Sequence, residues 1–206
     1  RARNFLEVPT GYTPEMAMQE AQRCIQCKKP GCVAGCPVGI DIPGFIKLIR
    51  EGEFTQAIRH IWQKNSLPAV CGRVCPQEEQ CEQVCVVAKI DQPVAIGRLE
   101  RFVADYEREH ELIEIPEKAA STGKRVAVVG AGPAGLACAH RLAMKGHDVI
   151  VYDARPKAGG LNEFGIASYK TVGGFAQAEV DWLLKIGGIT VETGQRLGRD
   201  ITLNGL

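Results

Sequence analysis

The distribution of cysteine is the feature that most constrains this chain of 206 residues, because eight of its nine cysteines lie between Cys24 and Cys85. In a secreted protein such density would indicate a disulfide framework. A glycine-rich nucleotide-binding motif later in the chain favours the reducing cytosol, where clustered cysteines are more often metal ligands. The sequence therefore predicts a metal-binding region followed by a nucleotide-binding region.

Composition excludes several classes of protein. The chain is 45% hydrophobic and 24% charged, which is typical of a globular protein. Its net charge of +1 and the lack of a basic stripe predict no nucleic-acid or acidic-membrane partner. We find no apolar run of about 18 residues and no signal peptide, so we expect a cytoplasmic protein that does not span a membrane.

Residues 1–115 have the pattern of a small helical domain. Thr13 and Asp41 are each followed within two residues by proline, as at the start of a helix. Apolar residues recur at helical spacing in residues 53–64 and 96–106. Helices this short would form a marginal core, so bound metal clusters would have to stabilise the domain.

The pattern changes after residues 116–124, which are typical of a linker. The run Val126-Ala127-Val128-Val129 predicts a parallel strand buried on both faces. We expect residues 125–206 to form part of a three-layer α/β domain of the Rossmann type. The elements expected after the first strand are a helix to Lys145, a strand over 149–152, a helix over 177–185 and a strand over 189–191.

The first cysteine run, Cys24-x2-Cys27-x4-Cys32-x3-Cys36-Pro37, follows the run of bacterial ferredoxins. Three thiolates in a tight loop can bind three corners of one cubane cluster, and the cysteine before proline then points toward another cluster. A zinc ribbon normally separates its two Cys-x2-Cys pairs by ten or more residues, so zinc is the less favoured alternative.

The second run, Cys71-x3-Cys75-Pro76-x5-Cys81-x3-Cys85, again contains a Cys-Pro pair. Together the two runs offer eight thiolates, enough for two clusters with four ligands each. The number of ligands does not decide which cysteine serves which cluster. On the residues alone, Glu100 between Leu99 and Arg101 would be a solvated helix-surface residue.

Several segments resemble the small (beta) subunit of NADPH-dependent glutamate synthase. They are residues 24–32, residues 36–45, Cys71-Gly-Arg-Val-Cys-Pro76 and Ile96-Gly-Arg-Leu-Glu-Arg101. The same module occurs in the large subunit of NADH-dependent ferredoxin:NADP oxidoreductase and in the N-terminal region of dihydropyrimidine dehydrogenase. The resemblance covers nearly the whole chain, and in this family the chain would be truncated, without the NAD(P)H-binding domain.

The resemblance implies the ligands of two [4Fe-4S] clusters. One cluster would be held by Cys24, Cys27, Cys32 and Cys85. The other would be held by Cys36, Cys75, Cys81 and Glu100, because the family places a Glu or Gln on the helix that follows. Cys71 would then be a non-ligand, although Cys71 in place of Glu100 is an open alternative.

A second motif predicts a dinucleotide site. Gly130-Ala131-Gly132-Pro133-Ala134-Gly135 follows a predicted strand and opens a predicted helix, as the GxGxxG motif requires. Asp153, at the end of the second strand, stands where an acid binds a ribose hydroxyl, or it is a turn residue. The motif does not distinguish NAD from FAD. The resemblance implies FAD, with Gly159-Gly160-Leu161 close to it; these glycines could instead form an ordinary loop.

The resemblance implies an oxidoreductase subunit in which electrons pass from NAD(P)H through FAD to the clusters and a large catalytic subunit. The alternatives are a subunit of a ferredoxin:NADP transhydrogenase or of a dihydropyrimidine dehydrogenase-like enzyme, and, in another class, a zinc-stabilised interaction module. We predict no catalytic side chain, and the truncated chain alone would be inactive. Cys138 is predicted to be a packed core thiol, His140 a helix-surface residue and His147 a turn residue.

Overall fold

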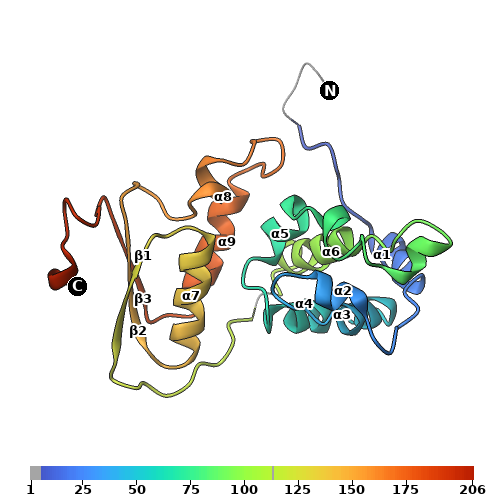
Figure 1. The fold of residues 1–206 in the computed structure, drawn as a ribbon, viewed down its shortest axis with the longest axis horizontal. Coiled ribbons are helices and arrows are strands. Elements are labelled where there is room, and N and C mark those ends of the chain that lie inside the picture. Colours follow the sequence, from blue (N-terminus) through green and yellow to red (C-terminus); the bar gives the residue numbers. More distant parts are fainter. Residues whose placement is uncertain (1–5, 113) are drawn as a thin grey trace. The chain divides into compact units, whose positions relative to one another are not determined.

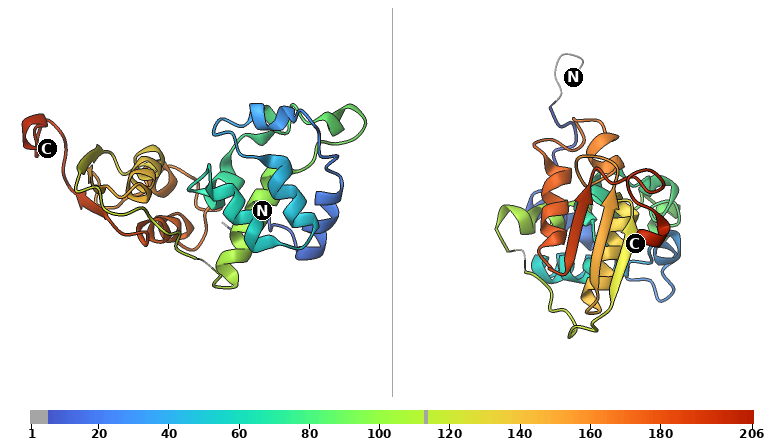
Figure 2. Two further views of the ribbon diagram at one scale, coloured as in Figure 1. Left: turned by 90° about the horizontal axis from the view of Figure 1, so that it is seen from below. Right: turned by 90° about the vertical axis from the view of Figure 1, so that its left-hand side faces the viewer.

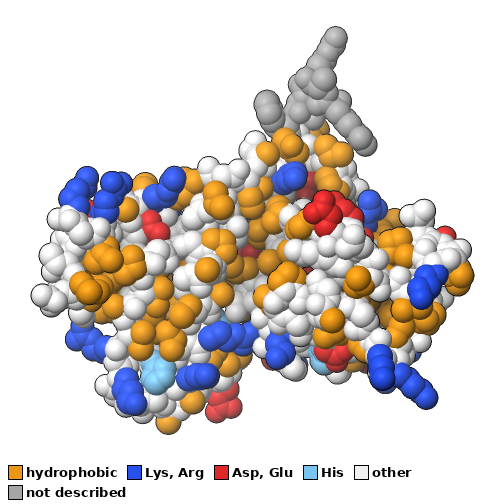
Figure 3. Space-filling view, viewed as in Figure 1, with side chains coloured by type: hydrophobic (Ala, Val, Ile, Leu, Met, Phe, Trp, Pro, Cys, Tyr) orange, Lys and Arg blue, Asp and Glu red, His pale blue; other side chains and the backbone are white. Residues whose placement is uncertain are grey.

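The computed structural model describes residues 6–112 and 114–206 (Figure 1). Within them the chain forms two compact units. Residues 8–112 form the cysteine-rich unit, and residues 114–206, with Leu6 and Glu7, form the second unit. No helix in the described part of the chain is long and apolar enough to cross a membrane. On the face shown in Figure 3, basic and acidic side chains are scattered rather than gathered in a basic stripe.

Short helices make up the regular structure of the cysteine-rich unit. Thr13 Oγ1 accepts a hydrogen bond from Met16 N at 3.3 Å, and Asp41 Oδ1 accepts one from Gly44 N at 3.2 Å, which confirms both predicted helix starts. The elements are α1 (Pro14–Gln22), α2 (Gly31–Gly35), α3 (Ile42–Arg50), α4 (Phe54–Trp62), α5 (Pro68–Val74), α6 (Ile96–Glu109) and the 3-10 helices η1 (Gln77–Glu79) and η2 (Val86–Lys89).

Helix α6 is the central support of this unit, because α1, α3, α4 and α5 all pack against it. The ring of Phe54 on α4 meets the ring of Phe102 on α6 edge-on, with centroids 5.0 Å apart. Leu99 and Val103 on α6 are fully buried, as are Phe45 and Ile49 on α3. The packing fixes the rotation of α6 and hence the direction of every side chain on it.

Helices α5 and α6 approach each other so closely that only glycine fits at position 72. A Cβ atom there would lie 2.6 Å from the backbone nitrogen of Arg101. Arg73 on α5 donates to both carboxylate oxygens of Asp105 on α6, each at 2.8 Å. These contacts hold Cys71 and Cys75, which flank this part of α5, beside the middle of α6.

The second unit is a parallel sheet with helices, as expected for a Rossmann-like βαβ unit. The strand order is β1-β2-β3, with Arg125 opposite Asp148 and Val149 opposite Ile189 (Figure 2). The elements are β1 (Arg125–Val129), α7 (Pro133–Met144), β2 (Asp148–Asp153), α8 (Leu161–Phe164), α9 (Phe175–Leu184), β3 (Ile189–Thr193) and the 3-10 helix η3 (Leu203–Gly205).

The prediction that the first strand is buried on both faces is wrong. Within β1 no residue is buried, and Val129 is 52% exposed. Helices α7 and α9 both lie on one face of the sheet (Figure 1). Because successive strand residues point to opposite faces, the β1 residues that point away from those helices remain accessible.

Two predictions for α7 are also wrong, and both errors have one cause: the helix buries a different face from the one expected. Cys138 is exposed rather than packed in the core, and His140 is buried, with 5% of its surface exposed. The buried face of α7 contains Leu136, Ala139, His140 and Ala143, which share the spacing of one helix face. Cys138 lies on another face of the helix. His147 lies in the connection between α7 and β2, where its Nδ1 is 2.7 Å from Thr122 Oγ1.

Burial of His140 predicts a pH dependence of stability. Burial, and then the nearby charge of Arg141, lowers the pKa of His140 to about 4. The unfolded chain has an ordinary histidine pKa of about 6.5. Between pH 6.5 and about 4, His140 is therefore protonated in the unfolded chain but neutral in the folded chain. We expect the free energy of unfolding to fall by on the order of 3 kcal/mol as the pH drops from about 7 to 4.

Denaturant unfolding at several pH values, followed by circular dichroism, measures this effect. In the His140→Gln variant that part of the pH dependence should be lost, whereas the exposed His110→Gln variant serves as the control. If His140→Gln keeps the full pH dependence of the wild type, the assignment to His140 is wrong.

Candidate metal centre and nucleotide-binding loop

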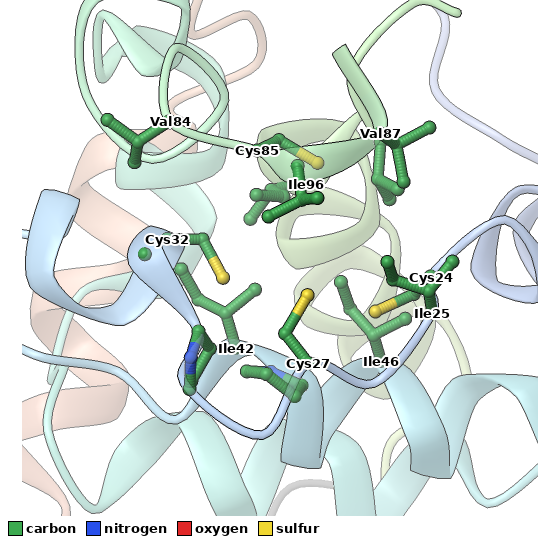
Figure 4. A pocket seen from close by; sticks show the side chains of 15 residues that line it. Cys24, Ile25, Cys27, Cys32, Ile42, Ile46, Val84, Cys85, Val87 and Ile96 are labelled. Carbon is green, nitrogen blue, oxygen red and sulfur yellow. The ribbon is translucent and has the colours of Figure 1, made fainter. Parts of the chain in front are cut away.

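Four cysteines from both runs line one cavity in the cysteine-rich unit. Cys24 follows α1, Cys27 lies in the next loop, Cys32 is in α2 and Cys85 precedes η2. Figure 4 shows their sulfur atoms turned toward a shared space. These are the four residues that the family resemblance predicted for one cluster, and the fold brings Cys85 to the other three across a long stretch of chain.

The walls of this cavity are apolar, and the cavity with its mouth contains about 390 Å³ free of protein atoms. Burial, together with the neighbouring thiols of Cys24 and Cys85, raises the pKa of Cys32 to about 11. Burial likewise raises the pKa of Cys24, with added effects from Cys27 and Cys85. Thiolates so placed need a cationic partner, which fits a metal cluster as the occupant. The apolar wall residues include Ile25, Ile42, Ile46, Val84, Val87 and Ile96.

Gln26, between two of these cysteines, is a residue that the sequence analysis did not single out. Its φ of 52° is in the left-handed region, which is uncommon for a residue other than glycine. Its side-chain amide nitrogen donates to the sulfur of Cys24 at 3.4 Å and to the carbonyl of Pro43 at 3.1 Å. A hydrogen bond of this kind orients a ligand sulfur and tunes its basicity. Its place between two candidate ligand cysteines was the signal that the sequence offered.

The second predicted ligand set is Cys36, Cys75, Cys81 and Glu100. Glu100 is only 6% exposed, so it is not the solvated surface residue that the helical pattern alone indicated. Burial, together with the negative charges of Glu82, Cys36 and Glu100, raises the pKa of Cys81 to about 12. That electrostatic effect indicates that Cys36 and Glu100 each lie within charge-interaction range of Cys81.

Cys71 and Cys75 interact directly. A hydrogen bond from the Cys71 thiol lowers the pKa of Cys75 to about 7. The pKa of Cys71 is raised by that same bond, by burial and by the charge of Glu100. Glu100 thus lies close to Cys71 as well. Among the described residues, no group of three or more His, Cys, Asp or Glu side chains is arranged to hold a single metal ion.

The glycine-rich loop has the geometry that its motif requires. Gly130 has a φ of +102°, and a Cβ atom on Gly135 would overlap the carbonyl of Gly130. Gly132 caps the N-terminus of α7, and Pro133 occupies its first turn. The loop therefore presents a helix N-terminus, where an anion such as a pyrophosphate is stabilised. Ala134 is exposed on the first turn.

Asp153 connects the end of β2 to this loop. Its carboxylate accepts hydrogen bonds from the backbone nitrogens of Ala131 at 2.6 Å and Arg155 at 2.7 Å. The side chain thereby closes its own turn and holds the glycine-rich loop against the strand end. Both interpretations of Asp153, as a turn residue and as a residue beside a bound ribose, are compatible with this position.

The second glycine pair lies directly against the first loop. Gly159 N donates to the carbonyl of Ala131 at 2.7 Å. Gly160 has a φ of 53°, and a Cβ atom on it would lie 2.6 Å from the Cα atom of Gly132. Leu161 begins α8 and is 75% exposed. The fold thus brings the two predicted nucleotide-binding segments together, as a cofactor that touches both would require.

These two sites define the class of the protein: a thiol-rich helical unit suited to iron–sulfur clusters, joined in one chain to a Rossmann-like nucleotide-binding unit. Residues 1–112 match the family described as dihydropyrimidine dehydrogenase domain II, 4Fe-4S cluster. The chain belongs to this family. Residues 128–182 match a family of NAD(P)-binding Rossmann-like domains.

The chain is similar to several curated proteins. It is 37% identical to the NAD-dependent dihydropyrimidine dehydrogenase subunit PreT of Escherichia coli O157:H7, over 98% of this chain and 49% of that protein. It is 37% identical to the glutamate synthase [NADPH] small chain of Escherichia coli K12, over 98% of this chain and 43% of that protein. Identity to the corresponding small chain of Halomonas elongata is 40%, over 82% of this chain and 36% of that protein. The chain spans about half the length, or less, of these relatives.

The contact between the two glycine segments predicts the effect of a substitution. Gly160→Ala places a Cβ atom against Gly132 and also strains a positive φ, so we expect it to lower the free energy of unfolding by about 2–4 kcal/mol. Gly173→Ala is the matched control, because Gly173 has a φ of +65° with open space around it. Only backbone strain, about 1 kcal/mol, is expected there.

Urea unfolding followed by the fluorescence of Trp182 measures both variants, in a Trp62→Phe background that leaves a single tryptophan. Equal losses of stability in the two variants would show that the packing of Gly160 on Gly132 contributes nothing.

Proposed function

We propose that this chain is part of an iron–sulfur flavoprotein oxidoreductase subunit in which electrons pass from NAD(P)H through FAD to two [4Fe-4S] clusters and on to a partner. The function we favour is that of the small subunit of an NADPH-dependent glutamate synthase. The observation that carries the proposal is the convergence of Cys24, Cys27, Cys32 and Cys85 on one apolar cavity. The similarity to glutamate synthase small chains supports it.

The proposed cluster domain covers residues 1–115, with a linker at residues 116–124. Its first cluster would be bound by the four cysteines that line the cavity. The burial of Glu100, and the effects of Glu100 and Cys36 on the pKa of Cys81, support the second set, which also includes Cys75. A carboxylate is a harder ligand than a thiolate, so this set would give the second cluster different electronic properties from the first.

The proposed FAD site lies in residues 125–206. The residues assigned to it are Gly130, Gly132, Pro133, Ala134, Gly135, Asp153, Gly160 and Leu161. The contacts of Gly159 and Gly160 with the first loop support their place beside the cofactor. In the whole protein, NAD(P)H would bind in a domain separate from this FAD site.

The chain's own residues would act by binding and orientation rather than by acid–base chemistry. When bound, FAD supplies the conversion between hydride transfer and single-electron transfer, and the clusters supply single-electron carriers. The cysteines fix the clusters, the hydrogen bond from Gln26 orients Cys24, and apolar walls exclude water from the cavity. We propose a cytoplasmic protein whose partner is a large catalytic subunit.

A dihydropyrimidine dehydrogenase-like enzyme is the second candidate. The name of the relative from Escherichia coli O157:H7 favours it, at the same identity as the glutamate synthase small chain. Both candidates use the same electron-input chemistry, so the sites described above fit either. Domains outside this chain select the substrate.

Metal analysis tests the cluster assignment. We expect the anaerobically purified chain to contain about eight iron atoms and eight labile sulfides, and the Cys85→Ala variant to contain about four of each, because only one cluster loses a ligand. Colorimetric iron and sulfide assays and the absorption spectrum measure this. Zinc without labile sulfide in the reconstituted wild type would instead support a zinc-stabilised interaction module.

Activity of the whole protein with its partner tests the reaction. We expect oxidation of NADPH to depend on glutamine and 2-oxoglutarate together, because the partner would consume the electrons in forming glutamate. Spectrophotometry at the nicotinamide absorbance measures the rate. Oxidation that depends on a pyrimidine base and not on 2-oxoglutarate would support the second candidate.

A further inference from the structure

A buried amide side chain contacts the carboxylate proposed as a cluster ligand. Asn65 lies between α4 and α5 and is 8% exposed. Its Nδ2 donates a hydrogen bond to Oε1 of Glu100 on α6 at 2.8 Å. Both residues are buried, so the bond is not exposed to competition from bulk water, and a buried carboxylate gains most from such a donor.

The other end of Asn65 is fixed by the backbone. Its Oδ1 accepts a hydrogen bond from Leu67 N at 3.0 Å, and the thiol of Cys71 lies 3.8 Å from the same oxygen. Because Oδ1 accepts from a main-chain N–H, the amide cannot be flipped without losing that bond. The NH2 group is therefore directed toward Glu100, and the direction is set by the start of α5.

An amide donor suits a carboxylate that binds a metal. It satisfies one of the roughly four lone-pair sites of the carboxylate without adding a positive charge that would compete with iron. Carboxylates that ligate metals are commonly held by such hydrogen bonds from outside the ligand set. An arginine or lysine in the same place would form an ion pair and reduce the ability of the carboxylate to bind iron.

We propose that Asn65 is a positioning residue of the second cluster site, which holds the Glu100 carboxylate in the orientation that binds iron. The proposal rests on the assignment of Glu100 as a ligand made under Proposed function. Asn65 itself does not touch the cluster. Asn65 lies just before α5, the helix that contains Cys71 and is followed by Cys75. Its side chain therefore links this segment to Glu100, the proposed ligand on α6.

The Asn65→Asp variant tests the proposal, because it keeps the shape of the side chain and the acceptor for Leu67 N. It replaces the donor to Glu100 by a carboxylate oxygen that repels it. We expect the anaerobically reconstituted full chain to lose about half of its iron and labile sulfide and the electron paramagnetic resonance signal of one reduced cluster. Thermal unfolding of the metal-free variant, measured in parallel, would report any purely structural effect.

A compensating variant distinguishes positioning from structural damage. In Asn65→Asp with Glu100→Gln, the amide NH2 introduced at position 100 can donate to the carboxylate introduced at position 65, and its carbonyl oxygen would be left to bind iron. We expect this double variant to regain the iron content that Asn65→Asp alone loses. Cys71→Ala tests the alternative ligand, and it should retain full iron content if Glu100 is the ligand.

Three results would overturn the proposal. Asn65→Asp with unchanged iron content and an unchanged resonance signal would show that the hydrogen bond does not position a ligand. Loss of one cluster in Cys71→Ala but not in Glu100→Ala would show that Cys71 is the ligand. Failure of the wild type itself to take up iron and sulfide would overturn the proposed function, and this inference with it.

Discussion

The burial of several thiols in a very small helical unit is the constraint on which the cysteine-rich unit depends. Burial raises the pKa of Cys24, Cys32 and Cys81, and the neighbouring thiols raise it further. Such groups cannot all ionise next to one another unless a cation is bound between them. The core of the unit is made of short helices packed around α6, so cluster binding and folding would be linked, as in other small metal-binding domains.

The close contact between α5 and α6 determines the second half of the site. Gly72 lets the two backbones approach, and the Arg73–Asp105 pair holds them in register. This approach brings the Cys71–Cys75 segment to Glu100 and lets Asn65 reach the same carboxylate. The packing of α5 against α6 therefore also brings the candidate ligands together and places the hydrogen-bond donor Asn65 next to Glu100.

In the nucleotide-binding unit, backbone contacts rather than side-chain packing position the site. Its two loops meet through backbone contacts, with Gly159 N on the Ala131 carbonyl and Gly160 against Gly132. Asp153 joins the first loop to the end of β2 through backbone hydrogen bonds. A Cβ atom on Gly160 would lie only 2.6 Å from the Cα atom of Gly132, so the approach of the two loops requires glycine at position 160. The start of α7 then presents backbone N–H groups, which stabilise an anion such as a phosphate.

The sequence by itself determined the longer helices and the three strands, and it indicated the types of the candidate ligands. Capping residues such as Thr13 and Asp41, the cysteine spacing and the GxGxxG motif act locally, within a few residues of one another, so their geometry can be read from the chain. Only the tertiary structure decided which distant groups meet. It turned Glu100 inward, exchanged the faces expected for Cys138 and His140, and placed Gln26 and Asn65 behind the proposed ligands. The physical reason is that the rotation of a helix about its axis depends on all its packing partners, which no local pattern of residues contains.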